Sequence, residues 1–427
     1  MEGRSHFTRR RIVIVIILLT LCILVFLAIS NWSAIGTKLA NPMRQVFGVR
    51  AVAQMETFLF GIQDRIDGLK YKIGLSEPDV PWSLTTAPVQ IKTTNITISE
   101  TAISSPIAPE TTQADVQEVT DIPKTELVTG SPVVSTPSPT AIITSTPEHW
   151  NLVDVPSFGN LQGEGVWQPY IYDSSGDVVA LRTFLQPDPE RPYTLVAVVA
   201  FNLVKTDLHF VLGLKEPSKP GGPHGNGVIR PEDKEPGKLL AAFNGGFIAE
   251  HGNYGAMADG VTALAARAGL ATLVIYEDGE IRIGEWGKDF YVDEKYEAWR
   301  QNALMIIHNG EINPKVETGT WVEWGANLDG ATVTLRSSVG ISEDNQVLYY
   351  FAGPNLSMPV LADAMLAGGV YNGMLLDINP THAHFTAMRV VDGDIVAEPL
   401  YEEEMDLWID RYIGQWGQDF FYVTTKE

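Results

Sequence analysis

The sequence predicts an α+β fold for the C-terminal two thirds of the chain, with a mainly antiparallel sheet and a few helices. Three observations favour it: runs rich in β-branched and aromatic residues are many and short, several are joined by Asp-Gly pairs, and helix signals are few. An Asp-Gly pair between two such runs is a strong signal for a β-hairpin. This pattern disfavours a doubly wound parallel sheet, in which strands alternate with helices.

The expected strands and helices follow from composition and turn signals. Hairpin turns are predicted at Asp278-Gly279 and Asp392-Gly393. One helix is predicted over Ser357–Ala367, with a serine N-cap and a glycine after it, and another over Tyr401–Tyr412, whose start is acidic. The strands include Tyr193–Phe201, Leu239–Phe243, Thr272–Tyr276, Glu280–Ile283, Thr332–Leu335, Gln346–Phe351 and Met374–Ile378.

The N-terminus carries the signals of a membrane anchor. Residues 12–29 are an almost uninterrupted apolar run, which at about 1.5 Å per residue nearly spans a hydrocarbon core of roughly 30 Å. Three arginines precede the run, so the positive-inside rule places residues 1–11 in the cytoplasm. We expect an uncleaved signal anchor at 12–30, a single span in the cell membrane and an extracytoplasmic head. The alternative, a cleaved signal peptide, usually has an apolar region of about 7–15 residues.

A juxtamembrane helix is predicted over residues 43–74. Apolar residues from Val52 to Ile73 recur at alternating spacings of three and four, as in a coiled coil of three heptads. Gly61 and Gly68 interrupt this seam, each at a cost of about 1 kcal/mol relative to alanine. One interpretation is a homodimer through residues 52–73. The other is an amphipathic helix that lies on the membrane or docks on the main domain.

Residues 76–148 have a different composition. Thr, Ser, Pro, Val and Ile dominate them, and aromatic residues nearly vanish after Trp82. No period of 2 or 3.6 persists, so the segment cannot bury enough apolar surface to offset its chain entropy. We expect a disordered linker that holds the head domain, residues 149–427, at a distance from the membrane.

Composition excludes several classes of protein. The 30 Lys and Arg against 52 Asp and Glu give a net charge of −22, which repels phosphate backbones, so nucleic acid is not an expected partner. Cys22 is the only cysteine and allows neither an intrachain disulfide nor a thiolate zinc site. No cofactor is predicted with certainty, and a divalent metal would need oxygen and imidazole ligands.

Two neighbouring segments of the head contain candidate ligand-binding residues. The first places two glycines at the end of a buried strand, where the backbone can approach a ligand and offer N–H donors to an anion; the alternative is a bulge or tight turn. The second is a polar, glycine-rich loop, in which a turn requires neither the histidine nor the tyrosine. The candidates for substrate binding are Asn244, Gly245, Gly246, Phe247, His251 and Tyr254.

Two later segments contain candidate catalytic residues. Arg336 follows a strand, and its guanidinium either binds a phosphate or belongs to a solvated face. Asp377 ends a buried-looking strand, where a carboxylate is costly unless it is paired or functional. His382 and His384 follow, and on an extended segment their rings share one face. They would bind a metal with a third ligand from His251 or Asp259, or would act in hydrogen bonding, acid–base chemistry or substrate contact.

Together these segments resemble the phosphodiester glycosidase family. The blocks AAFNGGF, a glycine-rich loop, LRSSVGISEDNQVLYY, a helix and MLLD occur in the family's order between about Gly163 and Val423. Where the family pattern reads Leu-Asp-Gly-Gly-Gly-Ser, this chain has Leu376-Asp377 followed by Ile-Asn-Pro-Thr. The chain therefore looks like a divergent branch.

The resemblance implies a hydrolase that cleaves a sugar 1-phosphodiester or a related envelope glycan. Arg336 would neutralise the phosphate, Asp377 would stabilise an oxocarbenium ion or activate water, and His251, His382 or His384 would move protons. Asn379 would join the substrate-binding residues, and the partner would be an envelope carbohydrate or sugar phosphate. The alternatives are an altered domain that binds carbohydrate without cleaving it and a structural surface protein.

Overall fold

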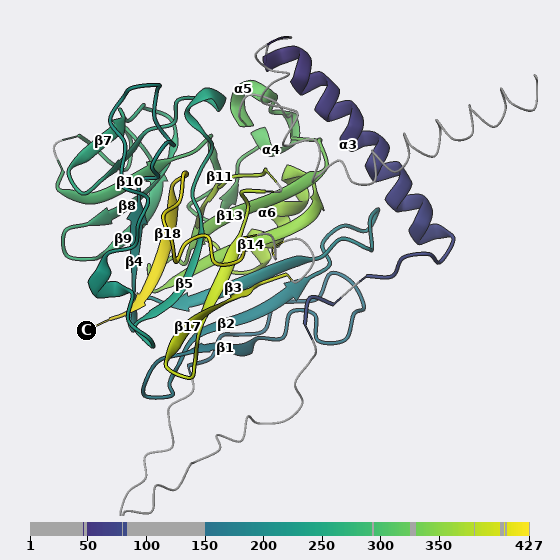
Figure 1. Ribbon diagram of the computed structural model, residues 1–427. Coiled ribbons are helices and arrows are strands. Elements are labelled where there is room, and N and C mark those ends of the chain that lie inside the picture. The colour runs from purple at the N-terminus through teal and green to yellow at the C-terminus, as the bar shows by residue number, and fades with distance from the viewer. Residues whose placement is uncertain are drawn as a thin grey trace, which may run out of the picture. The chain divides into compact units, whose positions relative to one another are not determined.

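The fold is seen in a computed structural model. It describes residues 46, 49–78, 80–82, 150–292, 294–324, 330–379, 381–401, 405 and 408–426. These residues contain three antiparallel sheets and a few helices (Figure 1), which confirms the sheet-dominated α+β prediction. No helix among them is long and apolar enough to cross a membrane, and the predicted anchor at 12–30 lies outside them.

The largest sheet has eight strands in the order β1-β2-β3-β14-β13-β15-β11-β12. Four of the predicted strands belong to it, although β13 extends six residues beyond its predicted end. The strands are β1 (Gln168–Tyr172), β2 (Val178–Leu185), β3 (Val196–Asn202), β11 (Met305–His308), β12 (Glu311–Ile312), β13 (Thr334–Ile341), β14 (Val347–Leu356) and β15 (Asn372–Leu375).

The other two sheets have five strands each, in the orders β7-β6-β10-β8-β9 and β17-β16-β5-β18-β4. The predicted Asp-Gly turns join β8 to β9 and β16 to β17. Asp392 and Gly393 have φ angles of 54° and 91°, as a tight hairpin turn requires. The strands are β4 (Thr206–Val211), β5 (Leu239–Asn244), β6 (Ala256–Ala258), β7 (Val261–Leu264), β8 (Ala271–Tyr276), β9 (Ile281–Glu285), β10 (Tyr296–Gln301), β16 (Phe385–Val391), β17 (Asp394–Pro399) and β18 (Phe420–Thr425).

The inner strands of the eight-stranded sheet are buried on both faces. One face contributes to a core shared with the other two sheets, in which Phe243 stacks on Phe385 and Phe421 at centroid distances of 6.3 and 5.4 Å. The other face packs against α4 (Lys315–Thr318) and α6 (Met358–Ala367). Every residue of β13 is consequently buried.

One of the two predicted helices of the head is present. The Ser357 hydroxyl caps α6 by accepting from the Val360 N–H at 3.5 Å, and Gly368 ends the helix. The prediction of a helix over 401–412 is wrong for the residues that the structure describes, because residues 408–412 form turns. Trp408 has a φ of 54°, a left-handed conformation that a right-handed helix cannot contain. The remaining short helices are α5 (Trp321–Trp324) and the 3₁₀ turns η1 (Pro231–Asp233) and η2 (Ala249–His251).

The helix α3 (Val49–Lys72) docks on the head. Both carboxylate oxygens of Asp64 accept from the Arg191 guanidinium, at 2.6 and 2.9 Å, and Tyr71 packs against Tyr193 at a centroid distance of 5.6 Å. This is the docking arrangement of the second interpretation above. The homodimer through residues 52–73 stays a prediction.

The chain after α3 also contacts the head. Trp82 is 9% exposed; it packs edge-on against Phe184, and the Arg182 guanidinium lies 4.3 Å above its ring. Residues 83–149 lie outside the described part of the chain, and Trp150, directly after them, packs against the core beneath α6. The residues on both sides of 83–149 thus contact the head, and the disordered linker predicted over 76–148 stays a prediction.

Candidate functional site

Strand ends meet at the candidate site. β5 ends at Asn244 and β15 ends at Leu375. The N–H of Asp377 donates to the carbonyl of Gly245 at 3.0 Å, which joins these two ends. β16 and β18 are both antiparallel to β5 and begin beside its end, so the residues that precede them reach the same place.

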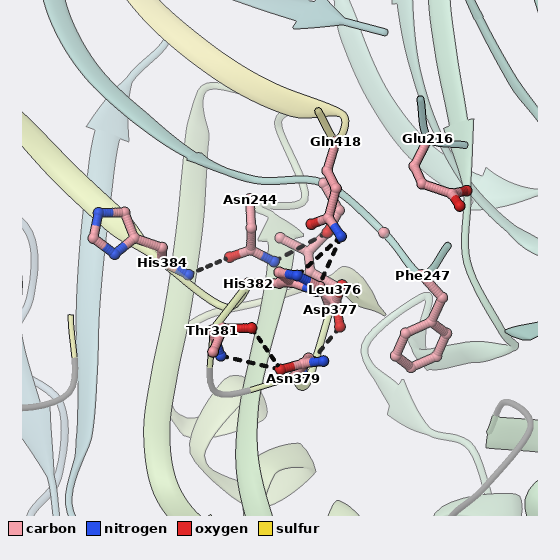
Figure 2. A network of polar contacts seen from close by, with 12 residues as sticks. Glu216, Asn244, Phe247, Leu376, Asp377, Asn379, Thr381, His382, His384 and Gln418 are labelled. Carbon is pink, nitrogen blue, oxygen red and sulfur yellow. Dashed lines mark hydrogen bonds and ion pairs between the residues drawn. The ribbon is translucent and has the colours of Figure 1, made fainter. Parts of the chain in front are cut away.

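We call Asp377, Asn379, His382 and Gln418 the Asp377 cluster (Figure 2). One Asp377 oxygen accepts from the Asn379 N–H at 2.9 Å, and the other lies 3.4 Å from Nδ1 of His382. The Gln418 amide nitrogen lies 3.1 Å from the same Nδ1. Asp377 is 5% exposed, whereas the His382 side chain is 25% exposed. A carboxylate and an accessible imidazole in contact can move protons near neutral pH.

The Gly245 and Gly246 amides both donate to Asp419, and the Gly246 amide binds its carboxylate, an anion that belongs to the protein. Asp419 accepts from the Gly246 N–H through its carboxylate and from the Gly245 N–H through its carbonyl, each at 3.1 Å. Arg300, which is fully buried, donates to the same carboxylate at 2.7 Å. Burial, and in smaller part the charge of Asp377, raise the pKa of Asp419, while Arg300 lowers it. The ion pair fixes the backbone on which Asp377 rests.

Asn244 is buried and holds the backbone of the site through four hydrogen bonds. It is 3% exposed, and its amide donates to the Gly245 carbonyl and to Ser337, each at 3.0 Å. Its oxygen accepts from Tyr350 and from the His384 N–H, also at 3.0 Å. Asn244 thus ties three strands together and orients the segment that carries His382.

Glu216 is a second carboxylate of the site. It lies in the loop after β4, and its carboxylate accepts from the Ala249 N–H at 2.8 Å. Burial raises its pKa, and the charge of Asp419 contributes in the same direction. Figure 2 shows Glu216 and Phe247 to the right of the Asp377 cluster. A carboxyl group with a raised pKa can act as a general acid.

The histidines do not share a face. His382 lies in a turn, with its N–H donating to the Asn379 carbonyl at 2.8 Å, so the segment is not extended there. His384 points away from the Asp377 cluster (Figure 2) and is 1% exposed. Burial, followed by the charge of Arg411, lowers the pKa of His384 to about 3, so its imidazole is neutral at physiological pH. The expected one-face geometry is therefore wrong.

Arg336 lies on the opposite face of β13 from Ser337, because successive side chains of a strand alternate. Ser337 donates to the Asp377 carbonyl at 2.6 Å, whereas Arg336 donates to the carbonyls of Leu356 and Thr332 at 2.8 and 2.7 Å. The structure does not bring Arg336 together with Asp377. The solvated-face alternative is also wrong, because Arg336 is 0% exposed.

The other predicted residues are distributed around the site. Phe247 and Tyr254 are 4% exposed, and their rings lie 6.0 Å apart, with His251 at 6.5 Å from Phe247. Asp259 is exposed and pairs with Arg230 at 2.9 Å. Among the described residues, no three His, Cys, Asp or Glu side chains gather as a metal site requires. The metal hypothesis with His251 or Asp259 thus gains no support from them.

Comparison with known proteins agrees with the motifs. The family model of the phosphodiester glycosidases matches residues 237–377. The resemblance to this family is confirmed. The matched phosphodiester glycosidase segment begins just before β5 and ends at Asp377, and thus contains Asn244, Arg300 and Arg336. No curated protein sequence matches the chain significantly.

The solved structures that match this chain have low sequence identity to it and low TM-scores. The zebrafish N-acetylglucosamine-1-phosphodiester alpha-N-acetylglucosaminidase catalytic domain, auto-inhibited by its pro-peptide, has 14% identity and a TM-score of 0.38, with 65% of this chain and 97% of that chain covered. A hypothetical protein from Synechocystis has 10% identity and a TM-score of 0.30, with 61% and 62% covered. A putative exported protein from Burkholderia pseudomallei has 10% identity and a TM-score of 0.26, with 54% and 74% covered.

Four residues of the site were not predicted from the sequence: Glu216, Arg300, Gln418 and Asp419. Asp419 directly precedes the buried strand β18, so it carries the signal that identified Asp377, a carboxylate at a strand end. Glu216 lies in a long loop rich in Gly and Pro, a common location for functional residues. For Arg300 and Gln418 the sequence offers no comparable signal.

Proposed function

We propose that the head hydrolyses a sugar 1-phosphodiester or a related envelope glycan at Asp377. The family match over residues 237–377 supports the class of reaction. The contact between Asp377 and His382, at 3.4 Å, is the observation that carries the assignment to this site. The Asp377 N–H also donates to Gly245 of the NGGF block. The proposal retains Asp377 and His382 as catalytic residues and leaves out Arg336 and His384.

The proposed reaction is hydrolysis at the anomeric carbon of the sugar. Hydrolysis breaks the bond between the anomeric carbon and the phosphate oxygen, and water supplies the new hydroxyl group and a proton. Asp377 either stabilises the oxocarbenium ion or accepts the proton of the attacking water. His382 in its protonated form places a positive charge beside the phosphate, and Glu216 with its raised pKa donates a proton where the leaving oxygen needs one.

Hydrolysis is tested with the full chain on a panel of sugar 1-phosphodiesters, with and without a chelator. Asp377→Asn and His382→Gln are expected to lower kcat by about 10²- to 10⁴-fold. Asp259→Asn is the control, since Asp259 is exposed and pairs with Arg230. If the wild-type protein binds these sugars but hydrolyses none of them, the head is a carbohydrate-binding domain and the hydrolase proposal is wrong.

We further infer that the head works outside the cytoplasmic membrane, held by residues 12–30 and facing envelope carbohydrate. The arginine triplet and the length of the apolar run support this topology. Mass mapping of the mature N-terminus tests it. A mature chain that starts between Ser30 and Ala40 would demonstrate cleavage and contradict the anchor.

A further inference from the structure

Two tryptophans form an aromatic surface beside the Asp377 cluster. Trp408 is 54% exposed, and its ring lies 6.2 Å from that of Trp416 at an angle of 53°. Trp408 also has a φ of 54°, which residues other than glycine rarely adopt. A large apolar ring is therefore held in solvent by a backbone conformation that is itself unfavourable, a combination that is typical of functional positions.

Arg411 connects this aromatic surface to the site. Its guanidinium carbon lies 5.9 Å from the Trp408 ring and 5.1 Å from the Trp416 ring, and its Nε donates to the Trp408 carbonyl at 3.1 Å. Its Nη1 donates to the carbonyl of Thr381 at 2.7 Å. Thr381 in turn donates through its N–H to Asn379, a member of the Asp377 cluster. Trp408 and Asp377 thus belong to one continuous set of contacts.

Trp416 is fixed from a second direction. Its N–H donates to the Gly227 carbonyl at 2.8 Å, and its carbonyl accepts from the Leu214 N–H at 3.1 Å. The loop that carries Glu216 therefore contacts the backbone of Trp416. Gln418, two residues after Trp416, contacts His382 and belongs to the Asp377 cluster.

We propose that Trp408 and Trp416 bind a pyranose ring of the substrate, next to the sugar that reacts at Asp377. The C–H face of a pyranose is apolar and packs against an indole ring, while its hydroxyls remain hydrated. This inference rests on the proposed function, because continuity with the Asp377 cluster identifies the ligand as part of a glycan. It assigns an oligosaccharide, rather than a single sugar phosphate, as the substrate.

Binding is tested by calorimetry of the full chain with pentasaccharides of β-1,4-linked glucose and of β-1,4-linked N-acetylglucosamine. Trp408→Ala is expected to weaken binding of at least one of them by about three- to tenfold. Trp408→Phe keeps an aromatic ring and the same backbone demand, and is expected to restore most of the affinity. Tyr291→Ala is the control, since Tyr291 is 51% exposed and belongs to the segment between β9 and β10.

Equal affinity of the wild-type and Trp408→Ala proteins, or no binding of either pentasaccharide by the wild type, would overturn the proposal. A loss in the alanine variant that phenylalanine does not restore would also contradict it, because stacking requires an aromatic ring. These measurements need no hydrolysis. Failure of the Asp377 chemistry and failure of the aromatic subsite are thus separate results.

Discussion

Gly245 and Gly246 are required by their protein neighbours. A Cβ atom on Gly245 would lie 1.9 Å from a carboxylate oxygen of Asp419, and one on Gly246 would lie 2.9 Å from the Arg300 guanidinium carbon. The sequence predicted close approach of the backbone to an anion, and the anion is a side chain that lies more than 170 residues away in the chain. The signal was in the sequence, but the identity of the anion depends on the fold.

Gly245→Ala is therefore expected to destabilise the head by about 1–3 kcal/mol or more, because neither Asp419 nor the strand end can move without breaking the ion pair. Gly414→Ala is a matched control, since a Cβ there meets nothing within 4 Å, and should change stability by less than about 0.5 kcal/mol. Denaturant unfolding of both variants measures the difference. Similar stability of the two would contradict the packing argument.

The low pKa of His384 makes the free energy of unfolding depend on pH. Its pKa is about 3 in the folded protein and about 6.5 in an unfolded chain, so the unfolded state binds more protons between these values. Stability is expected to fall as pH drops from 6.5 towards 3, by up to about 1.4 kcal/mol per pH unit from this group, and to be unaffected by it above 6.5. Unfolding of His384→Gln at pH 7 and pH 5 tests this, since the variant should lose less stability between the two.

At the scale of elements, the hairpins and α6 were predictable because their signals are local. An Asp-Gly pair and a serine cap act within four residues. The helix expected at 401–412 was wrong because its acidic start is a local signal, whereas Trp408 has a left-handed backbone conformation and contacts Trp416 and Arg411. Periodicity identified α3, but could not identify its partner, since Arg191 lies 127 residues after Asp64.

Docking of α3 is tested by charge removal. Asp64→Asn is expected to weaken docking by about 1 kcal/mol, because the pair with Arg191 is partly exposed, and to speed amide hydrogen exchange along α3. Asp67→Asn on the same helix is the control, since the Asp67 carboxylate pairs with Lys70 one turn away. Equal exchange in the two variants would show that Asp64 does not hold the helix.

At the scale of the whole molecule, composition and turn signals predicted the fold class, whereas the order of strands in three sheets was beyond them. The Asp377 cluster combines residues from the segment between β15 and β16 with Gln418, which precedes β18. Such a site depends on which strands pair, and pairing is a non-local property. Asp377 and His382 were predicted because a carboxylate at the end of a buried strand and a histidine each stand out in the sequence, whereas Glu216 was not, because the composition of its loop does not single out one residue.

The contacts of Trp82 and α3 predict that the chain stays together when the segment between 83 and 149 is cut. A specific protease site inserted between Glu110 and Thr111 allows one cut. Gel filtration without denaturant should then elute both fragments together, because Asp64–Arg191 and Trp82–Phe184 hold them. Separation of the fragments would mean that these contacts are too weak to persist in solution. Asp64→Asn should increase the fraction that separates.

Docking of α3 also decides which part of the chain carries mechanical tension. If the N-terminus is fixed in a membrane and the head is bound to a wall polymer, a pulling force enters the head through Asp64 and Arg191 before it reaches residues 83–149. Force would reach residues 83–149 only after the contacts of α3 and Trp82 had broken. Under such a load, the Asp64–Arg191 pair and the Trp82–Phe184 contact would be the first to break, before any strand of the head is pulled apart.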